Sequence, residues 1–183
     1  MAKILGLSGS LRSGSFNTML LNAAVKLAPA GTTIEVASIR DIPLYDGDVE
    51  SAGFPAAVQV LKDKVIACDG LLIVTPEYNN SIPGVLKNAI DWLSRPPADA
   101  PRVFGGRKVG LIGATPGGGG TMLSQAAWLP VLRTLGTQPW FGGRLHVSHA
   151  PKVFDAQGEI TDDAIRGQLE KYLQGFAAFV SAR

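Results

Sequence analysis

The sequence has 183 residues, of which 46% are hydrophobic and 17% are charged, and its formal net charge is +2. So small a charge, without a stripe of Arg and Lys between aromatic residues, argues against a nucleic-acid partner. The single cysteine excludes an internal disulfide, and no apolar run is long enough to cross a membrane. We therefore expect one cytoplasmic domain over residues 1–183, without a membrane partner.

A short apolar strand at 4–7 is predicted to lead through a glycine- and serine-rich loop into a helix. Hydroxyls at Ser10, Ser15 and Thr18, with the guanidinium of Arg12, suit a phosphate at the helix N-terminus. A Walker loop would need a lysine, and a dinucleotide fingerprint would need G-x-G-x-x-G; neither is present. A terminal phosphomonoester therefore fits this loop best, and the alternative is a solvated loop that binds nothing.

The pattern Ser10-x-Arg12-x-x-Ser15-x-Asn17 resembles the phosphate loop of the NAD(P)H-dependent FMN reductases. That family has a flavodoxin-like fold and includes quinone and chromate reductases. The resemblance implies that Ser10, Arg12, Ser15 and Asn17 hold the FMN phosphate, with Phe16 and Thr18 also in the cofactor site.

The next elements are predicted to be a strand at 33–39, a loop at 41–48, a helix at 55–67 and a strand at 70–74. The acidic residues of the loop lack the spacing of a calcium loop, so a solvated acidic loop is favoured over a cation site. Cys68 precedes an uninterrupted apolar run, which predicts a buried thiol beside a central parallel strand.

The stretch 75–83 leaves the carboxyl end of that central strand, where open α/β sheets bind ligands. A helix follows from 84 to 94. The loop and helix resemble the isoalloxazine-binding segment of the same family, which places Pro76, Glu77, Tyr78 and Asn79 against the flavin. The alternative is a strand-to-helix connector with a surface tyrosine.

Residues 95–107 are predicted to form a loop, 108–114 a fourth strand and 121–135 a helix. Four consecutive glycines between the last two elements suggest either a flexible surface loop or a close approach of backbone to a flat ligand. By resemblance this loop faces the pyrimidine end of the flavin, through Thr115, Pro116, Gly117 and Gly118. The family usually has Ser near the start of this loop and Arg further on, so the side-chain roles here stay open.

A fifth strand is predicted at 137–147 and a last helix at 161–181. Five alternating strands and helices make an α/β fold, a flavodoxin-like doubly wound five-stranded parallel sheet of order 2-1-3-4-5 in three α/β/α layers. His146 and His149 have no partners at metal-ligand spacing and are interpreted as surface or packing residues, so we expect no metal.

Without a nucleophile–base or paired-carboxylate constellation, we expect no catalytic side chain, since the flavin would carry the chemistry. The resemblance implies an FMN enzyme that takes electrons from NADPH or NADH and passes them to a quinone, free flavin or an oxyanion such as chromate. Two alternatives are a flavodoxin-type electron carrier, against which the pI of about 8.8 argues, and a non-redox module. Arg102, Arg107 and Lys108 are candidates for a 2′-phosphate clamp.

We also expect a homodimer or homotetramer. The low charged fraction favours an interface, and Val85 and Trp92 lie off the apolar stripe of the helix at 84–94. Pairing of two such helices would bury both residues, and Lys87 and Asp91 would then pair across a two-fold axis. The resemblance implies dimers that form beside the flavin.

Overall fold

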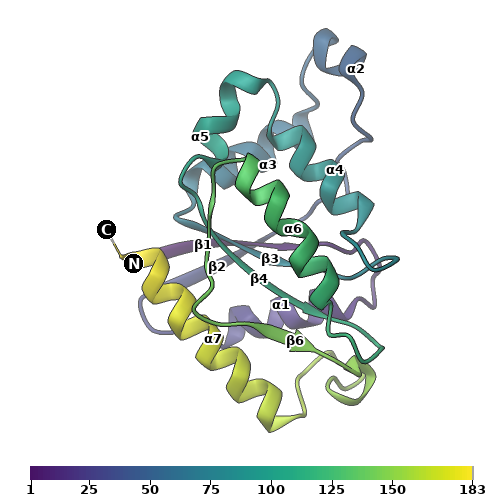
Figure 1. The fold of residues 1–183 in the computed structure, drawn as a ribbon, viewed down its shortest axis with the longest axis vertical. Coiled ribbons are helices and arrows are strands. Elements are labelled where there is room, and N and C mark those ends of the chain that lie inside the picture. Colours follow the sequence, from purple (N-terminus) through teal and green to yellow (C-terminus); the bar gives the residue numbers. More distant parts are fainter. Residues whose placement is uncertain (183) are drawn as a thin grey trace.

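The computed structural model describes residues 1–182, which fold around one parallel sheet (Figure 1). The hydrogen-bonded order is β2-β1-β3-β4-β5, with β6 also on β4, so the predicted order is confirmed. The strands are β1 (Ala2–Ser8), β2 (Thr32–Ala37), β3 (Gly70–Val74), β4 (Lys108–Ala114), β5 (Gln138–Pro139) and β6 (Leu145–Val147). The helices are α1 (Phe16–Lys26), α2 (Gly47–Ala52), α3 (Ala56–Ala67), α4 (Gly84–Leu93), α5 (Ala100–Phe104), α6 (Met122–Thr134) and α7 (Asp163–Ser181).

The two faces of the sheet carry two separate hydrophobic clusters because successive side chains of a strand point in opposite directions. In β3, Leu72 and Val74 pack beneath α1 and α7, whereas Leu71 and Ile73 pack beneath α3, α4 and α6. Figure 1 shows these two helical layers on opposite sides of the sheet. Within residues 1–182, no helix combines the length and apolarity that a membrane-spanning helix would need.

The connections from β1 and β3 leave toward opposite faces of the sheet, since α1 and α4 belong to different layers. β1 and β3 are hydrogen-bonded neighbours, with Ile4 opposite Gly70 and Ser8 opposite Val74. The crevice of a doubly wound sheet opens where crossovers diverge in this way. The loops that follow β1, β3 and β4 therefore meet at one edge of the sheet.

The predicted fifth strand was wrong as one continuous element, because β5 and β6 are separated by an irregular segment at 140–144. Pro139 has no N–H to donate to a ladder. The indole of Trp140 then folds over its own chain, where added β-carbons at Gly142 and Gly143 would lie 2.5 and 2.8 Å from its ring. The ring packs edge-on against Tyr172 of α7 at 4.7 Å between centroids.

Two segments predicted as loops contain short helices. Asp46 caps α2, accepting the backbone N–H of Asp48 at 2.8 Å, so the acidic loop ends in a helix rather than remaining irregular. In the stretch 95–107, a 3-10 turn at Pro97–Asp99 leads into α5. Pro101 lies in the first turn of α5, where a missing N–H costs nothing.

The predicted role of Trp92 at an interface was wrong, because its side chain is fully buried in its own domain. The indole packs edge-on against Tyr45 and Phe54, and its Nε1–H donates to the Pro43 carbonyl at 2.9 Å. Val85 packs against the cluster beneath α4, and Lys87 pairs with Asp91 of its own helix at 2.6 Å. Lys87 and Asp91 stay partly exposed, so only the expected role of Trp92 is contradicted.

Candidate functional site

The loop after β1 is closed by Ser15, the N-cap of α1. Its Oγ accepts the backbone N–H groups of Asn17 and Thr18 at 3.2 and 3.4 Å, which leaves the hydroxyl hydrogen free to donate. Nearby, the Arg12 guanidinium donates to the Gly14 carbonyl at 2.8 Å. A guanidinium has five N–H donors, so most of its donor capacity stays available in this loop.

Asn17 lies in the site and also links two of its loops. Its side chain is 4% exposed, and it donates to the Ala114 carbonyl and accepts the Ala114 N–H, both at 2.9 Å. Both polar ends of the amide are thus engaged by the last residue of β4. The side chain joins the first and third loops of the site, and the second N–H of its amide remains available to a ligand in the cavity that it lines.

The loop after β3 is held close to the first loop. An added β-carbon at Gly9 would lie 2.8 Å from Pro76 and 2.9 Å from Leu86, so the contact requires glycine at this position. Glu77 reaches across to α6, where its Oε2 accepts the Ser124 N–H at 3.0 Å. This carboxylate caps the helix from outside, since the N-cap residue Thr121 makes no side-chain cap.

A buried polar network beneath this loop fixes β3 to α6. Thr75 Oγ1 donates to the Pro76 carbonyl at 2.9 Å and lies 3.0 Å from Ser124 Oγ. The Trp128 Nε1–H donates to the same hydroxyl at 3.1 Å. All three side chains are fully buried. The network gives the site a rigid base, and its members were not recognised from the sequence because each looks like an ordinary core or helix residue.

The backbone is tightly packed on both sides of the glycine loop that follows β4. A β-carbon on Gly113 would lie 2.3 Å from the Thr75 carbonyl oxygen, and Gly120 has a φ of 56°. The loop is held from the other side, since the Gly117 carbonyl accepts the His149 N–H at 2.9 Å and the Gly118 carbonyl accepts the Ser148 hydroxyl at 2.8 Å. The four glycines thus form a loop anchored at two carbonyls.

These three loops enclose a cavity of about 180 Å³. Apart from Ala114, every residue of its lining was predicted from the sequence; the lining consists of Ser10, Arg12, Ser15, Phe16, Asn17, Pro76, Glu77, Tyr78, Ala114, Thr115 and Pro116. Four predicted residues lie outside this lining: Thr18, Asn79, Gly117 and Gly118. Ala114 gave no signal in the sequence because it ends an apolar strand, and it contributes through its backbone.

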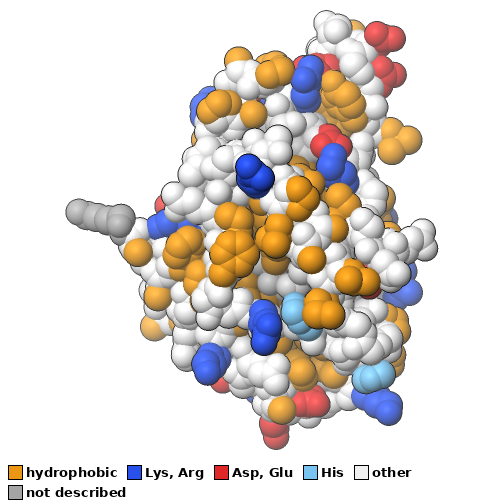
Figure 2. All heavy atoms as spheres, in the orientation of Figure 1, with side chains coloured by type: hydrophobic (Ala, Val, Ile, Leu, Met, Phe, Trp, Pro, Cys, Tyr) orange, Lys and Arg blue, Asp and Glu red, His pale blue; other side chains and the backbone are white. Residues whose placement is uncertain are grey.

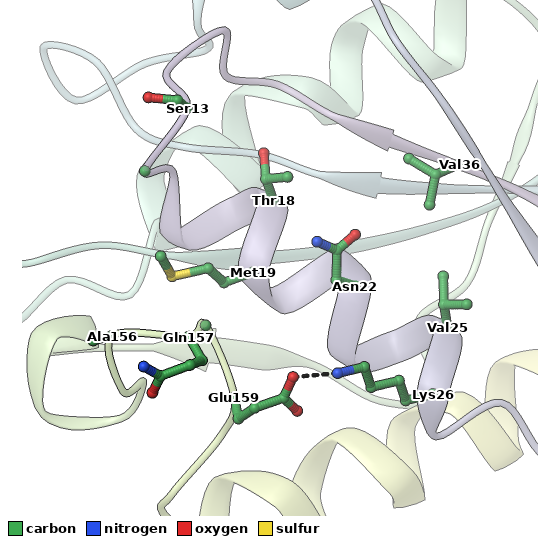
Figure 3. A pocket seen from close by; sticks show the side chains of 12 residues that line it. Ser13, Thr18, Met19, Asn22, Val25, Lys26, Val36, Ala156, Gln157 and Glu159 are labelled. Atoms are coloured by element: carbon green, nitrogen blue, oxygen red, sulfur yellow. Dashed lines mark hydrogen bonds and ion pairs between the residues drawn. The ribbon is translucent and has the colours of Figure 1, made fainter.

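Thr18 lies beside the candidate cavity, and its hydroxyl is 2.9 Å from Ser8 Oγ. It lines a hollow of about 720 Å³ between α1, Val36 of the edge strand β2 and the turn at 156–159 (Figure 3). The charged groups drawn there, Lys26 and Glu159, pair with each other. This hollow therefore offers no unpaired charge to a ligand.

The three candidates for a 2′-phosphate clamp lie near the amino end of β4, whereas the site lies at the carboxyl ends of the strands. Arg107 donates to the carbonyls of Val103 and Cys68, and Lys108 donates to carbonyls at the end of α7. Arg102 lies on α5, which precedes the first residue of β4. The prediction of a clamp at these residues does not agree with their positions.

The remaining titratable residues support structure. Cys68 is buried as predicted, and burial raises the pKa of its thiol, which makes it a poor nucleophile. Hydrogen bonds from Arg95 and then Tyr45 lower the pKa of Glu50. Across residues 1–182, no three His, Cys, Asp or Glu side chains gather as a metal site would require.

The chain is similar to known reductases over nearly its whole length. The family model described as NADPH-dependent FMN reductase matches residues 2–152. The chain is 44% identical over 178 residues to an NAD(P)H-dependent FMN reductase of Pseudomonas aeruginosa, covering 97% of this chain and 95% of that protein. It is 38% identical to a 2-hydroxy-1,4-benzoquinone reductase of a Burkholderia species, covering 99% and 97% of the two chains.

Solved structures show the same similarity. The flavoenzyme NAD(P)H:(acceptor) oxidoreductase FerB of Paracoccus denitrificans superposes with a TM-score of 0.89 at 32% identity, covering 98% of this chain and 97% of that one. An NADH:FMN oxidoreductase in its apo form superposes with a TM-score of 0.72 at 20% identity, covering 100% and 92%, which supports the fold alone.

Proposed function

This chain belongs to the NADPH-dependent FMN reductase family, and we propose that it passes electrons from NADPH or NADH through bound FMN to a quinone, to free flavin or to an oxyanion such as chromate. It is an NAD(P)H-dependent flavin/quinone oxidoreductase, and FMN is its cofactor. We further propose that residues 1–183 act as one domain, since one sheet supports both hydrophobic clusters. We also propose that the protein works in the cytoplasm, where its single thiol stays reduced.

The cavity at the carboxyl ends of β1, β3 and β4 carries this proposal. Its volume of about 180 Å³ is well below the roughly 300–1,000 Å³ of pockets that enclose a drug-sized ligand. It therefore suits one end of FMN, the phosphate with its ribityl chain. The ring would then extend over the loops that contain Asn79, Gly117 and Gly118, outside the cavity.

The donors present fit a phosphomonoester. Ser15 and Ser10 supply hydroxyl groups, Arg12 supplies the positive charge, and the N-terminus of α1 supplies the positive end of a helix dipole. The lining lies wholly within residues 1–182, and Glu77 is its only acidic residue. One of its oxygens is engaged by the Ser124 N–H.

Bound FMN would supply the hydride chemistry, and the chain would bind it, orient it and leave one face accessible. Tyr78 is 43% exposed beside the cavity, which suits a residue that packs at the border of an open ring face. The N-terminus of α6 points its positive dipole end to the same edge, where it would stabilise negative charge on a reduced ring. Asn17 and Glu77 hold the three loops at fixed distances.

We expect the purified protein to be yellow and to release FMN, not FAD, on denaturation, because the site has one phosphate loop and no dinucleotide fingerprint. Chromatography of the released flavin decides this. Steady-state oxidation of NADPH and NADH with benzoquinone, free FMN and chromate then compares the acceptors. A protein that accepts electrons once and does not turn over would be a flavodoxin-type carrier. Release of FAD, or no flavin uptake from excess FMN, would contradict the proposal.

We also propose that the protein is a homodimer or homotetramer, although Trp92 does not support it. The outward side of α6 exposes Met122, Leu123 and Leu129 at 54%, 47% and 37%. Figure 2 shows apolar side chains gathered on the face that α6 occupies. An apolar group of this kind on a helix beside a ligand site is typical of an interface.

Light scattering during size-exclusion chromatography is expected to give a mass of at least twice 19.2 kDa at micromolar concentration. Leu123→Glu is expected to shift the protein toward the monomer, because it places a charge on the apolar side of α6. Val60→Glu, at a position 57% exposed on α3, is the matched control and should leave the mass unchanged. A wild-type mass near 19.2 kDa would contradict the proposal.

A further inference from the structure

The serine–arginine turn of the phosphate loop occurs twice at this edge of the sheet. Ser10-Leu11-Arg12 follows β1, and Ser38-Ile39-Arg40 follows β2. In the first turn the Arg12 N–H donates to Ser10 Oγ at 3.3 Å, and in the second the Arg40 N–H donates to Ser38 Oγ at 3.0 Å. Each serine accepts from its own turn and keeps its hydroxyl hydrogen to donate.

The two turns lie side by side because their strands are parallel neighbours in register. Leu7 of β1 is opposite Ala37 of β2, so the residues that follow leave the sheet together. The Arg40 guanidinium donates to the Leu11 carbonyl and so joins the second turn to the first. Ile39, 4% exposed, anchors the second turn in the core beneath.

A second cavity of about 310 Å³ opens between these turns. It shares Ser10 and Arg12 with the candidate FMN site, and it adds Ser38 and Arg40 from the second turn. None of its lining residues, all of them within 1–182, has an acidic side chain. With FMN bound and its phosphate engaging Arg12, the Arg40 guanidinium and several hydroxyls would still face a space that FMN does not need.

We propose that this cavity binds the 2′-phosphate of NADPH, through Arg40 and Ser38. The inference rests on the proposed function and names the donor that the enzyme prefers. The strand order puts β2 three strand spacings from β4, about 14 Å at roughly 4.8 Å each. An extended dinucleotide whose nicotinamide lies over the ring near β3 and β4 would place its adenosine end near β2.

Arg40→Ala tests the proposal in the holoenzyme. The KM for NADPH is expected to rise about tenfold or more, the size expected for one charge-assisted contact, while the KM for NADH and both kcat values stay unchanged. Arg102→Ala is the matched control, an exposed arginine on α5 at the opposite edge. An equal rise in KM for both donors, or no rise for NADPH, would overturn the proposal.

A binding measurement separates this inference from the enzyme's activity. By calorimetry, 2′,5′-ADP is expected to bind the holoenzyme about tenfold or more tightly than 5′-ADP, and Arg40→Ala and Ser38→Ala should reduce this difference. Equal binding of the two probes would overturn the inference even if the enzyme is active. A preference for 2′,5′-ADP in a protein that does not oxidise NADPH would support the site and contradict the proposed function. A matching loss of FMN affinity in Arg40→Ala would instead assign the cavity to the flavin phosphate.

Discussion

Replacing Asn17 by alanine is expected to lower the free energy of unfolding by about 2–6 kcal/mol. The substitution removes both hydrogen bonds to Ala114, whose backbone N–H and carbonyl would be left without partners in a residue only 2% exposed. An unsatisfied buried group costs roughly 1–3 kcal/mol, and two such groups give the expected range. Urea unfolding of the flavin-free protein, followed by circular dichroism, measures the change.

Asn22→Ala is the matched control for this experiment. Asn22 lies on the same helix but is exposed, so its replacement should change stability by no more than about 0.5 kcal/mol. Both substitutions alter helix propensity equally, so that contribution cancels in the comparison. If Asn17→Ala kept full stability and lost only FMN affinity, the side chain would bind the phosphate as the motif suggested, and the assignment to Ala114 would be wrong.

Replacing Arg12 by alanine is expected to weaken FMN binding by about 1.5–3 kcal/mol, roughly a 10- to 150-fold rise in the dissociation constant. The structure describes every residue that lines the candidate FMN cavity, and Arg12 is the only basic one among them. No other side chain of the lining can therefore neutralise a phosphate dianion. Quenching of FMN fluorescence on titration with flavin-free protein measures the affinity. Stability should change little, because Arg12 is exposed and bonds only within its own loop.

Arg12→Lys separates charge from geometry in the same titration. Lysine keeps the positive charge but not the planar fork of donors, so an intermediate affinity is expected. An unchanged dissociation constant in Arg12→Ala would show that the guanidinium points to solvent in the complex. Together, the Asn17 and Arg12 variants should divide the phosphate-loop motif into a residue that holds the loops and a residue that holds the ligand.

The sequence by itself determined the central elements and their order. β3 and β4 begin and end at the predicted residues. The signal is strongest for β3, because a fully buried parallel strand is an uninterrupted apolar run. The loops after β1, β3 and β4 were predicted to meet because carboxyl ends of parallel strands share one edge. These signals are local, and the fold follows from combining them.

Only the tertiary structure decided which side chains serve the ligand and which serve the fold. Asn17 matched a phosphate motif, yet its partner is Ala114, 97 positions away. Trp92 looked like an interface residue, yet it packs beneath Tyr45 and Phe54 in its own domain. The second Ser-x-Arg turn gained meaning only from the register of β1 with β2. In each case the deciding contact joins residues far apart in the chain, and local periodicity carries no information about such contacts.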